Sequence, residues 1–334
     1  MEISRALRRQ LVAASQIFAQ IQSGRRNESF PSDQENEKSE SADSKSDPNE
    51  KLARHLALLF GFQQKDSSNM TFAPPNPFDQ QKAIPNVKHI LAVSSGKGGV
   101  GKSTVATNLA LALSKTCKVG LLDADIYGPS IPRMMGSLNQ KPEISPDQKM
   151  QPLIRFGMKL MSIGFIIEEN SAVVWRGPML FKAMEQFLRD VVWGELDYLI
   201  VDLPPGTGDI QLSLAQKVPV AGALIVSTPQ NIALIDAKKA IDMWSRVAVP
   251  ILGVVENMSY LLTPNGEKMQ LFPRGEMDAY LDAKKIPKLG EVPFNPHVSL
   301  ASEAGIPIVE SHPKSVESMA FFNVAEKIRA RLPV

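Results

Sequence analysis

A glycine-rich segment at residues 96–104 has the residue types and spacing needed to hold a phosphate chain. Glycines let the backbone curl until several N–H groups point at one phosphate. Lys102 can reach the β- and γ-phosphates as a point charge, and the Ser103 hydroxyl can bind Mg²⁺. The expected ATP-binding residues here are Gly96, Lys97, Gly98, Gly99, Val100, Gly101, Lys102, Ser103 and Thr104. The segment fits the full pattern G-x-x-x-x-G-K-S/T, so it predicts a site for ATP with Mg²⁺.

Three aspartates follow apolar runs and are candidates to complete this site. Asp202 ends the run LIVD, where a carboxylate is costly unless it has a partner. Mg²⁺ with its waters is such a partner, so Asp202 is predicted to bind the metal together with Ser103. Asp123 and Asp125 follow the run VGLL, and capping the next helix is the simpler alternative for both.

Asn257 follows a later apolar run and is a candidate to contact the base. Its amide both donates and accepts hydrogen bonds, which matches the amino and ring-nitrogen edge of adenine. The alternative is that this asparagine only forms a turn.

Alternating strands and helices must position these residues. Apolar runs at 89–95, 118–125, 197–205, 222–229 and 250–258 predict buried strands. Helical periodicity is found at 104–115, 179–192 and 231–247, and the first of these directs its N-terminal dipole at the phosphates. This order predicts an α/β fold with a doubly wound, mostly parallel sheet and helices on both faces. Ligands bind such sheets at the carboxyl ends of the strands, where every candidate lies.

The chain ahead of the sheet divides into two parts. Residues 1–26 are amphipathic and carry five arginines against one acid, Glu2, which predicts a mitochondrial transit peptide and a place in the matrix. A surface helix of a cytosolic protein is the alternative. Residues 27–86 are predicted to hold a disordered acidic segment, a short helix at 49–60 and a proline-rich linker. The catalytic domain is expected over 87–334.

Composition excludes several classes of partner and cofactor. The net charge of +2 favours no nucleic-acid partner. No apolar run reaches about 18 residues, so we expect no stable membrane insertion. The single cysteine, Cys117, can form neither an internal disulfide nor a four-cysteine metal site.

The segment SGKGGVGKST resembles the deviant Walker A motif of the MinD, ParA, nitrogenase iron protein and Mrp ATPases, a SIMIBI-type group of P-loop NTPases. The resemblance implies an ATP-dependent homodimer in which Lys97 contacts the nucleotide of the other subunit. LLDADIYGPS resembles switch I, with Asp125 favoured to orient the attacking water and Asp123 to bind metal, although the two roles could be exchanged. PPGTGD resembles switch II, which implies a γ-phosphate contact from Gly206. EVPFNPHV resembles the loop that packs on the base near Pro293.

Long blocks over residues 83–330, including WRGPM and STPQNIALIDAKKAI, are similar to the Mrp/ApbC branch of iron–sulfur cluster carrier ATPases. With the N-terminal segment, the resemblance points to mitochondrial members that help to assemble respiratory complex I. It implies slow ATP hydrolysis and iron–sulfur client proteins.

One motif of that branch is missing. The family continues after ENMSY to a C-P-x-C-G segment, whose cysteines hold a [4Fe–4S] cluster between two subunits. Here Thr263 stands at the first cysteine position, and the second is deleted between Asn265 and Gly266. Three explanations fit: a cluster-free ATPase, a mixed dimer with a cysteine-bearing paralogue, or a misassigned splice junction near Thr263.

Two other function classes remain open. A MinD- or ParA-like positioning ATPase needs a membrane-binding helix or a basic DNA-binding surface, and the end NVAEKIRARLPV is a short anchor with modest charge. A nucleotide-gated interaction module without turnover would need neither cluster nor hydrolysis.

Overall fold

The computed structural model describes residues 81–166 and 177–334. The predicted transit peptide and the segments between it and residue 80 lie outside these ranges. Within them, Ile84 is already buried in the core, and the backbone N–H of Lys82 donates to the carbonyl of Lys217. Residues ahead of 87 therefore pack on the domain. No helix in the described part of the chain is long and apolar enough to cross a membrane.

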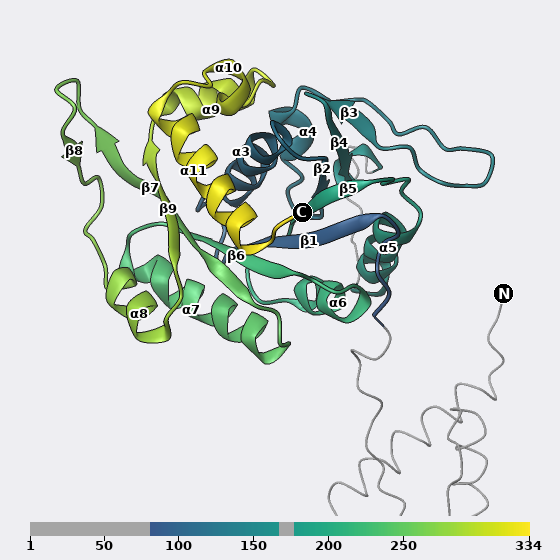
Figure 1. Cartoon of the computed structure of the whole chain (residues 1–334), viewed down its shortest axis with the longest axis horizontal. Coiled ribbons are helices and arrows are strands. Elements are labelled where there is room, and N and C mark those ends of the chain that lie inside the picture. The colour runs from purple at the N-terminus through teal and green to yellow at the C-terminus, as the bar shows by residue number, and fades with distance from the viewer. Residues whose placement is uncertain (1–80, 167–176) are drawn as a thin grey trace, which may run out of the picture. The chain divides into compact units, whose positions relative to one another are not determined.

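A mixed, mostly parallel sheet forms the centre of the domain (Figure 1). Its strand order is β3-β4-β2-β5-β1-β6-β7-β8, and β9 also pairs with β7. The strands are β1 (Val87–Ser94), β2 (Val119–Asp123), β3 (Leu153–Arg155), β4 (Met158–Ser162), β5 (Leu196–Asp202), β6 (Gly222–Ser227), β7 (Ile251–Leu262), β8 (Lys268–Met269) and β9 (Lys288–Phe294). Among the strand pairs of the described residues, β3–β4 and β7–β8 alone are antiparallel. The predicted fold class is confirmed.

Helices cover both faces of this sheet (Figure 1). One side carries α3 (Lys102–Ser114), α4 (Ile131–Met134), α9 (Pro296–Glu303), α10 (Ile308–Ser311) and α11 (Val316–Arg331). The other carries α5 (Gly177–Arg189), α6 (Asp209–Lys217), α7 (Asn231–Arg246) and α8 (Met277–Lys284). A 3₁₀ turn, η2 (Ile163–Phe165), follows β4.

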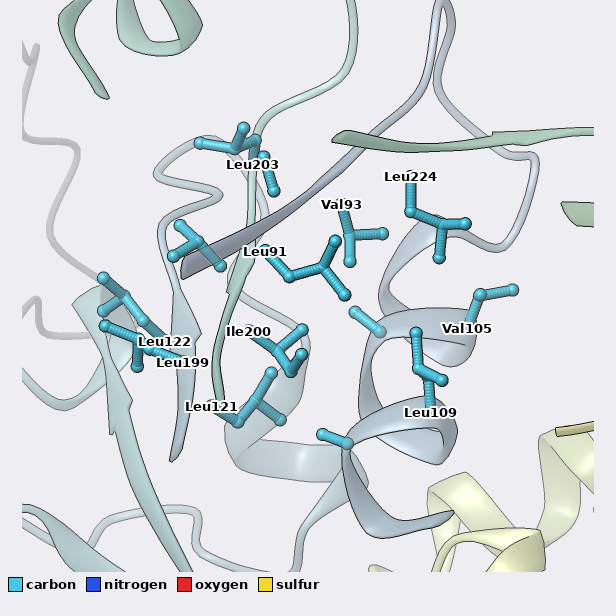
Figure 2. Packing of buried hydrophobic residues seen from close by; sticks show 14 of the residues in the cluster. Leu91, Val93, Val105, Leu109, Leu121, Leu122, Leu199, Ile200, Leu203 and Leu224 are labelled. Carbon is cyan, nitrogen blue, oxygen red and sulfur yellow. The ribbon is translucent and has the colours of Figure 1, made fainter. Parts of the chain in front are cut away.

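The core explains why these strands form where they do. Leu91, Leu121 and Ile200 lie on the three neighbouring central strands and are fully buried. They pack beneath Val105 and Leu109 of α3 (Figure 2). Burying strands on both faces requires near-continuous apolar runs, and these are the runs visible in the sequence. The packing fixes the carboxyl ends of β1, β2 and β5 side by side.

Three differences from the sequence-based expectation bear on the site. Helix α3 begins at Lys102, two residues before Thr104. Strand β7 continues to Leu262, and the segment around Pro293, expected to be a loop, is strand β9 followed by α9. Pro293 is tolerated because β9 pairs with β7 alone, so the missing N–H interrupts no second ladder.

Candidate functional site

The glycine-rich loop connects the end of β1 to the start of α3. Gly99 and Gly101 both have φ of 80°, in the left-handed region that favours glycine. Gly96 is required for a different reason, because a Cβ there would lie 2.1 Å from the backbone carbonyl of Asp236 in α7. The loop is thus held tightly between α3 and α7, with the N-terminus of α3 at its end.

Lys102 is the buried charge at the centre of the site. Its side chain is only 6% exposed, and its Nζ lies 2.8 Å from Asp202 Oδ1 and 3.3 Å from Asp125 Oδ2. Burial acts to lower the pKa of Lys102, but the nearby carboxylates outweigh it and raise that pKa. The lysine therefore stays protonated, and it also donates to Ser103 Oγ at 3.2 Å.

Asp202 has the features of a metal-binding carboxylate. It ends β5, is fully buried, and its Oδ2 has no hydrogen-bond partner. Burial raises its pKa, against the attraction of Lys102. An orphaned buried oxygen beside the Ser103 hydroxyl suits Mg²⁺, which commonly takes one or two protein ligands and completes its shell with phosphates and water. No set of three or more His, Cys, Asp or Glu side chains in the described residues could hold a metal by itself.

Asp123 is engaged differently from Asp202. Its Oδ1 accepts the N–H of Asp125 at 3.1 Å, and its Oδ2 accepts Ser162 Oγ at 2.9 Å and the N–H of Ile131 at 3.3 Å. Burial and the neighbouring Asp202 raise the pKa of Asp123 from 3.8 to about 8. These bonds hold both ends of the loop that carries Asp125. Metal binding by Asp123 stays a prediction.

A cavity of about 500 Å³ opens beside the glycine loop, and we call it the P-loop cavity. The predicted residues that line it are Lys97, Gly98, Gly99, Gly101, Lys102, Ser103, Thr104, Asp125, Asn257 and Pro293. Five predicted residues are not in its lining: Gly96, Val100, Gly206, Asp123 and Asp202. The structure thus brings the phosphate-binding and base-binding candidates to one opening at the carboxyl ends of the strands.

Two residues predicted to contact the nucleotide form hydrogen bonds within the protein instead. Asn257 is buried, and its Nδ2 donates to the carbonyl oxygen of Val100 at 2.9 Å. The backbone N–H of Gly206 donates to the carbonyl of Ser95 at 2.8 Å. A γ-phosphate contact from Gly206 therefore requires this bond to open, and both ligand contacts stay predictions.

One wall of the cavity was not foreseen from the sequence. It consists mainly of α4 and α9 residues, and an ion pair at 3.7 Å joins Arg133 of α4 to Glu303, the last residue of α9. The Asn295-Pro296 pair was a usable signal, because Asn295 caps α9 by accepting the N–H of His297. The lining residues missed are Ser95, Ser130, Arg133, Met134, Pro205, Met258, Val292, Phe294, Asn295, Val298, Ser299, Ser302 and Glu303.

The segment that would carry cluster cysteines is a closed β-hairpin at residues 261–269, here called the hairpin. Leu261 and Leu262 pair with Met269 and Lys268. At the turn, Thr263 Oγ1 accepts the N–H of Glu267 at 3.1 Å, and the Thr263 carbonyl accepts the N–H of Gly266 at 2.9 Å. These hydrogen bonds close the turn, which contains no thiolate.

Comparison with known proteins places this arrangement in a family. The profile of the family described as "ParA: NUBPL iron-transfer P-loop NTPase" matches residues 86–329. The chain belongs to this family. The resemblance drawn from the sequence motifs is therefore confirmed.

Individual relatives agree with this assignment. The iron-sulfur cluster carrier protein of Aquifex aeolicus is 48% identical over 253 residues, 75% of this chain and 70% of that protein. The Arabidopsis thaliana iron-sulfur protein required for NADH dehydrogenase, mitochondrial, is 48% identical over 245 residues, 72% of this chain and 78% of that one. A solved nucleotide-binding protein from Archaeoglobus fulgidus, in complex with ADP, has a TM-score of 0.61 and 39% identity, covering 72% and 93% of the two chains.

Proposed function

We propose that this chain is a slow, Mg²⁺-dependent ATPase that acts in the assembly of iron–sulfur proteins. The observation that carries the proposal is the buried set of Lys102, Asp125 and Asp202 at the foot of the P-loop cavity, with one carboxylate oxygen of Asp202 unpartnered. Such a set is costly to bury unless a ligand completes it. Mg-ATP supplies both the cation and the phosphate charge that fit these groups.

Each residue has a part in hydrolysis. Bound Mg²⁺, held by Ser103 and Asp202, would neutralise phosphate charge during transfer. Lys102 leaves its carboxylate partners to contact the β- and γ-phosphates, where its protonated state stabilises the charge that develops. Asp125, 3.3 Å from Lys102 Nζ, is placed to orient the attacking water.

A second subunit completes the site in this proposal. Lys97 lines the P-loop cavity and is not needed for the curl of its own loop. We assign it to the phosphates of the partner's nucleotide, so ATP closes a homodimer or a mixed dimer with a cysteine-bearing paralogue. Nucleotide-driven closure explains why slow turnover suffices, because the ATP-bound dimer is itself the working state.

The role in iron–sulfur assembly is supported by the family and by the Arabidopsis relative, whose name ties it to mitochondrial NADH dehydrogenase. We propose the mitochondrial matrix and the maturation of complex I. In cells deleted for this gene, the intact chain should restore complex I activity, and a Lys102→Ala chain should not. Full rescue by Lys102→Ala would exclude an ATP-dependent role.

The hairpin favours a second version of this function, a cluster-free, nucleotide-gated interaction module. Its turn is closed by hydrogen bonds between Thr263, Gly266 and Glu267, so it folds without a cluster. In this version the protein docks on its clients without carrying iron. Purified chain that hydrolyses no ATP, yet changes its association state with Mg-ATP, would favour the module over the ATPase. A MinD- or ParA-like positioning role predicts co-sedimentation with liposomes or DNA.

A further inference from the structure

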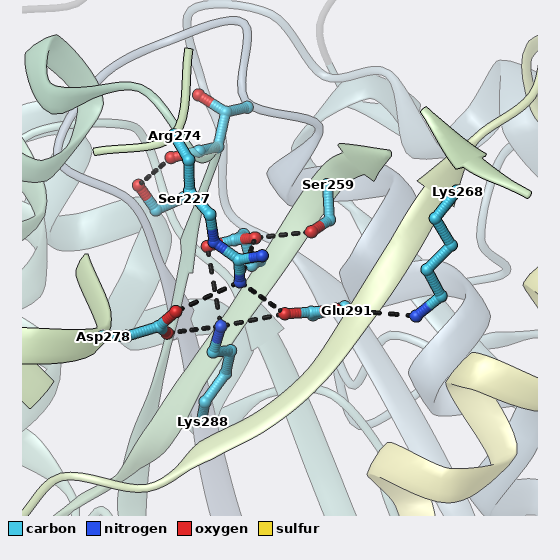
Figure 3. Close-up of polar contacts among 9 residues, drawn as sticks. Ser227, Ser259, Lys268, Arg274, Asp278, Lys288 and Glu291 are labelled. Carbon is cyan, nitrogen blue, oxygen red and sulfur yellow. Dashed lines mark hydrogen bonds and ion pairs between the residues drawn. The ribbon is translucent and has the colours of Figure 1, made fainter. Parts of the chain in front are cut away.

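Five charged side chains gather where β7, β9 and α8 meet, and we call them the β7–β9 charge cluster (Figure 3). Its members are Glu256, Arg274, Asp278, Lys288 and Glu291. Lys268 of β8 reaches the edge of the cluster, with its Nζ 3.9 Å from Glu291 Oε2. They belong to segments separated by up to 35 positions in the sequence, 256 to 291. None of them lines the P-loop cavity.

Glu256 is the buried member of the cluster. It is 1% exposed, its Oε1 accepts the hydroxyl of Ser259, and its Oε2 has no hydrogen-bond partner. The two cations, Arg274 Nη2 and Lys288 Nζ, each lie 3.9 Å from one of its oxygens. A buried carboxylate is costly without opposite charge, so these cations keep Glu256 in place.

The other two acids fix the cations. Glu291 Oε1 lies 2.8 Å from Arg274 Nη2 and 2.9 Å from Lys288 Nζ. Asp278 contacts the same two cations, with Arg274 at 3.1 Å. The cluster therefore ties the middle of β7 to β9, to α8 and to the segment between the hairpin and α8.

Directly after Glu256, the pairing of β7 with β9 is irregular. Pairing of β7 with β9 shifts register between Asn257 and Leu261, and Met258 has φ of 53°. The Ser259–Glu256 hydrogen bond spans this bulge. Bulges re-aim side chains, and this one directs Asn257 toward the carbonyl of Val100 in the glycine loop.

The same cluster also holds the opposite strand of the cavity. Glu291 precedes Pro293 by two residues in β9, and Pro293 lines the P-loop cavity together with Asn257 and Met258. In both β7 and β9, the first residue that lines the cavity directly follows a glutamate of the cluster. A change in the cluster would alter the cavity without touching a ligand inside it.

We propose that Glu256 is a positioning residue for nucleotide binding, which holds the β7 bulge through Arg274 and Lys288 so that Asn257 faces the glycine loop. The inference rests on the proposed function only in that the P-loop cavity binds ATP. Glu256 sets the affinity of the cavity and takes no part in phosphoryl transfer.

The test compares Glu256→Gln with the parent as full-length protein. Glutamine keeps the shape and can still accept from Ser259, but it leaves Arg274 and Lys288 without a buried counter-charge. We expect the Kd and KM for Mg-ATP to rise about tenfold, with kcat within about twofold, because Lys102, Asp125 and Asp202 are unchanged. Hydrogen exchange at residues 257–262 should also quicken in the nucleotide-free protein.

Two further variants separate positioning from general stability. Ser259→Ala, which leaves every charge in place, should raise KM by about threefold. Glu195→Gln, which breaks the exposed pair with Lys118 near the amino end of β5, should leave KM unchanged. A Glu256→Gln protein with the parent's KM and a lower unfolding midpoint would overturn the inference, as would a fall in kcat alone. If the parent itself binds no ATP, the proposed function fails first and the inference falls with it.

Discussion

Strand β7 passes from the P-loop cavity at Asn257 to the hairpin at Leu261, and the two regions differ in how their polar groups are satisfied. Lys102 lines the cavity and is enclosed by carboxylates, and Oδ2 of its partner Asp202 is buried without a hydrogen-bond partner. In the hairpin, Thr263 and its neighbours bond to one another. Unsatisfied buried groups point to a ligand, whereas a self-satisfied turn needs none to fold.

The comparison predicts that substitutions in the cavity abolish chemistry and those in the hairpin change stability alone. Lys102→Ala should give the largest effect, a fall in ATP turnover of at least about 100-fold, because it removes the buried cation that faces the phosphates. Phosphate release by the purified chain measures this. Lys115→Ala, near the other end of α3, is the matched control and should retain full activity. Equal rates for parent and Lys102→Ala would place the activity elsewhere.

Lys97→Ala should separate the dimeric part of the site from the monomeric part. We expect turnover to fall roughly tenfold or more, because a charge supplied in trans is lost at the transition state. Affinity of the monomer for ATP should change little. Sedimentation with Mg-ATP should show a dimer for the parent and a monomer for the variant. If the variant still forms a dimer with ATP, Lys97 is not needed for the dimer interface.

Replacing one glycine of the cavity and one of the hairpin by alanine compares the two regions directly. Gly101 and Gly266 have φ of 80° and 82°, so alanine costs about 1–2 kcal/mol of backbone strain at either. At Gly101 the new Cβ would also lie 2.1 Å from Asn257 Nδ2. Gly101→Ala should therefore lose ATP binding by calorimetry, while Gly266→Ala should only lower the urea midpoint. Loss of ATP binding in Gly266→Ala would show that the hairpin is part of the nucleotide site.

The pH dependence of stability should reveal the buried carboxylates. Asp123 has its pKa raised from 3.8 to about 8, so between these values the folded protein keeps a proton that the unfolded chain has released. Stability of the nucleotide-free protein should therefore fall as pH rises through this window, by at most about 1.4 kcal/mol per unit. Urea midpoints from pH 5 to 8 measure the slope. Asp123→Asn should flatten it, whereas Asp282→Asn, at an exposed position of α8, should not.

Sequence patterns predicted those parts of the fold and site whose signal lies within one short segment of the chain. The glycine loop and the apolar runs of β1, β2 and β5 carry their own signals, so the phosphate site and the central sheet could be anticipated. Strand β9 was missed because Pro293 is typical of a loop, and only its edge position makes a strand possible. The charge cluster was missed because residues such as Arg274 and Glu291 look like solvated surface charges until the fold brings them together.

The account rests on a chain that carries the residues of a nucleotide site and lacks the cysteines of a cluster site. The most direct test is one anaerobic reconstitution of the full-length chain with iron, sulfide and Mg-ATP, followed by measurement of nucleotide, iron and acid-labile sulfide per chain. We predict about one nucleotide per chain, and neither iron and sulfide in cluster amounts nor the visible absorption of a [4Fe–4S] cluster. A stable cluster bound by the dimer, with its absorption band, would contradict the account.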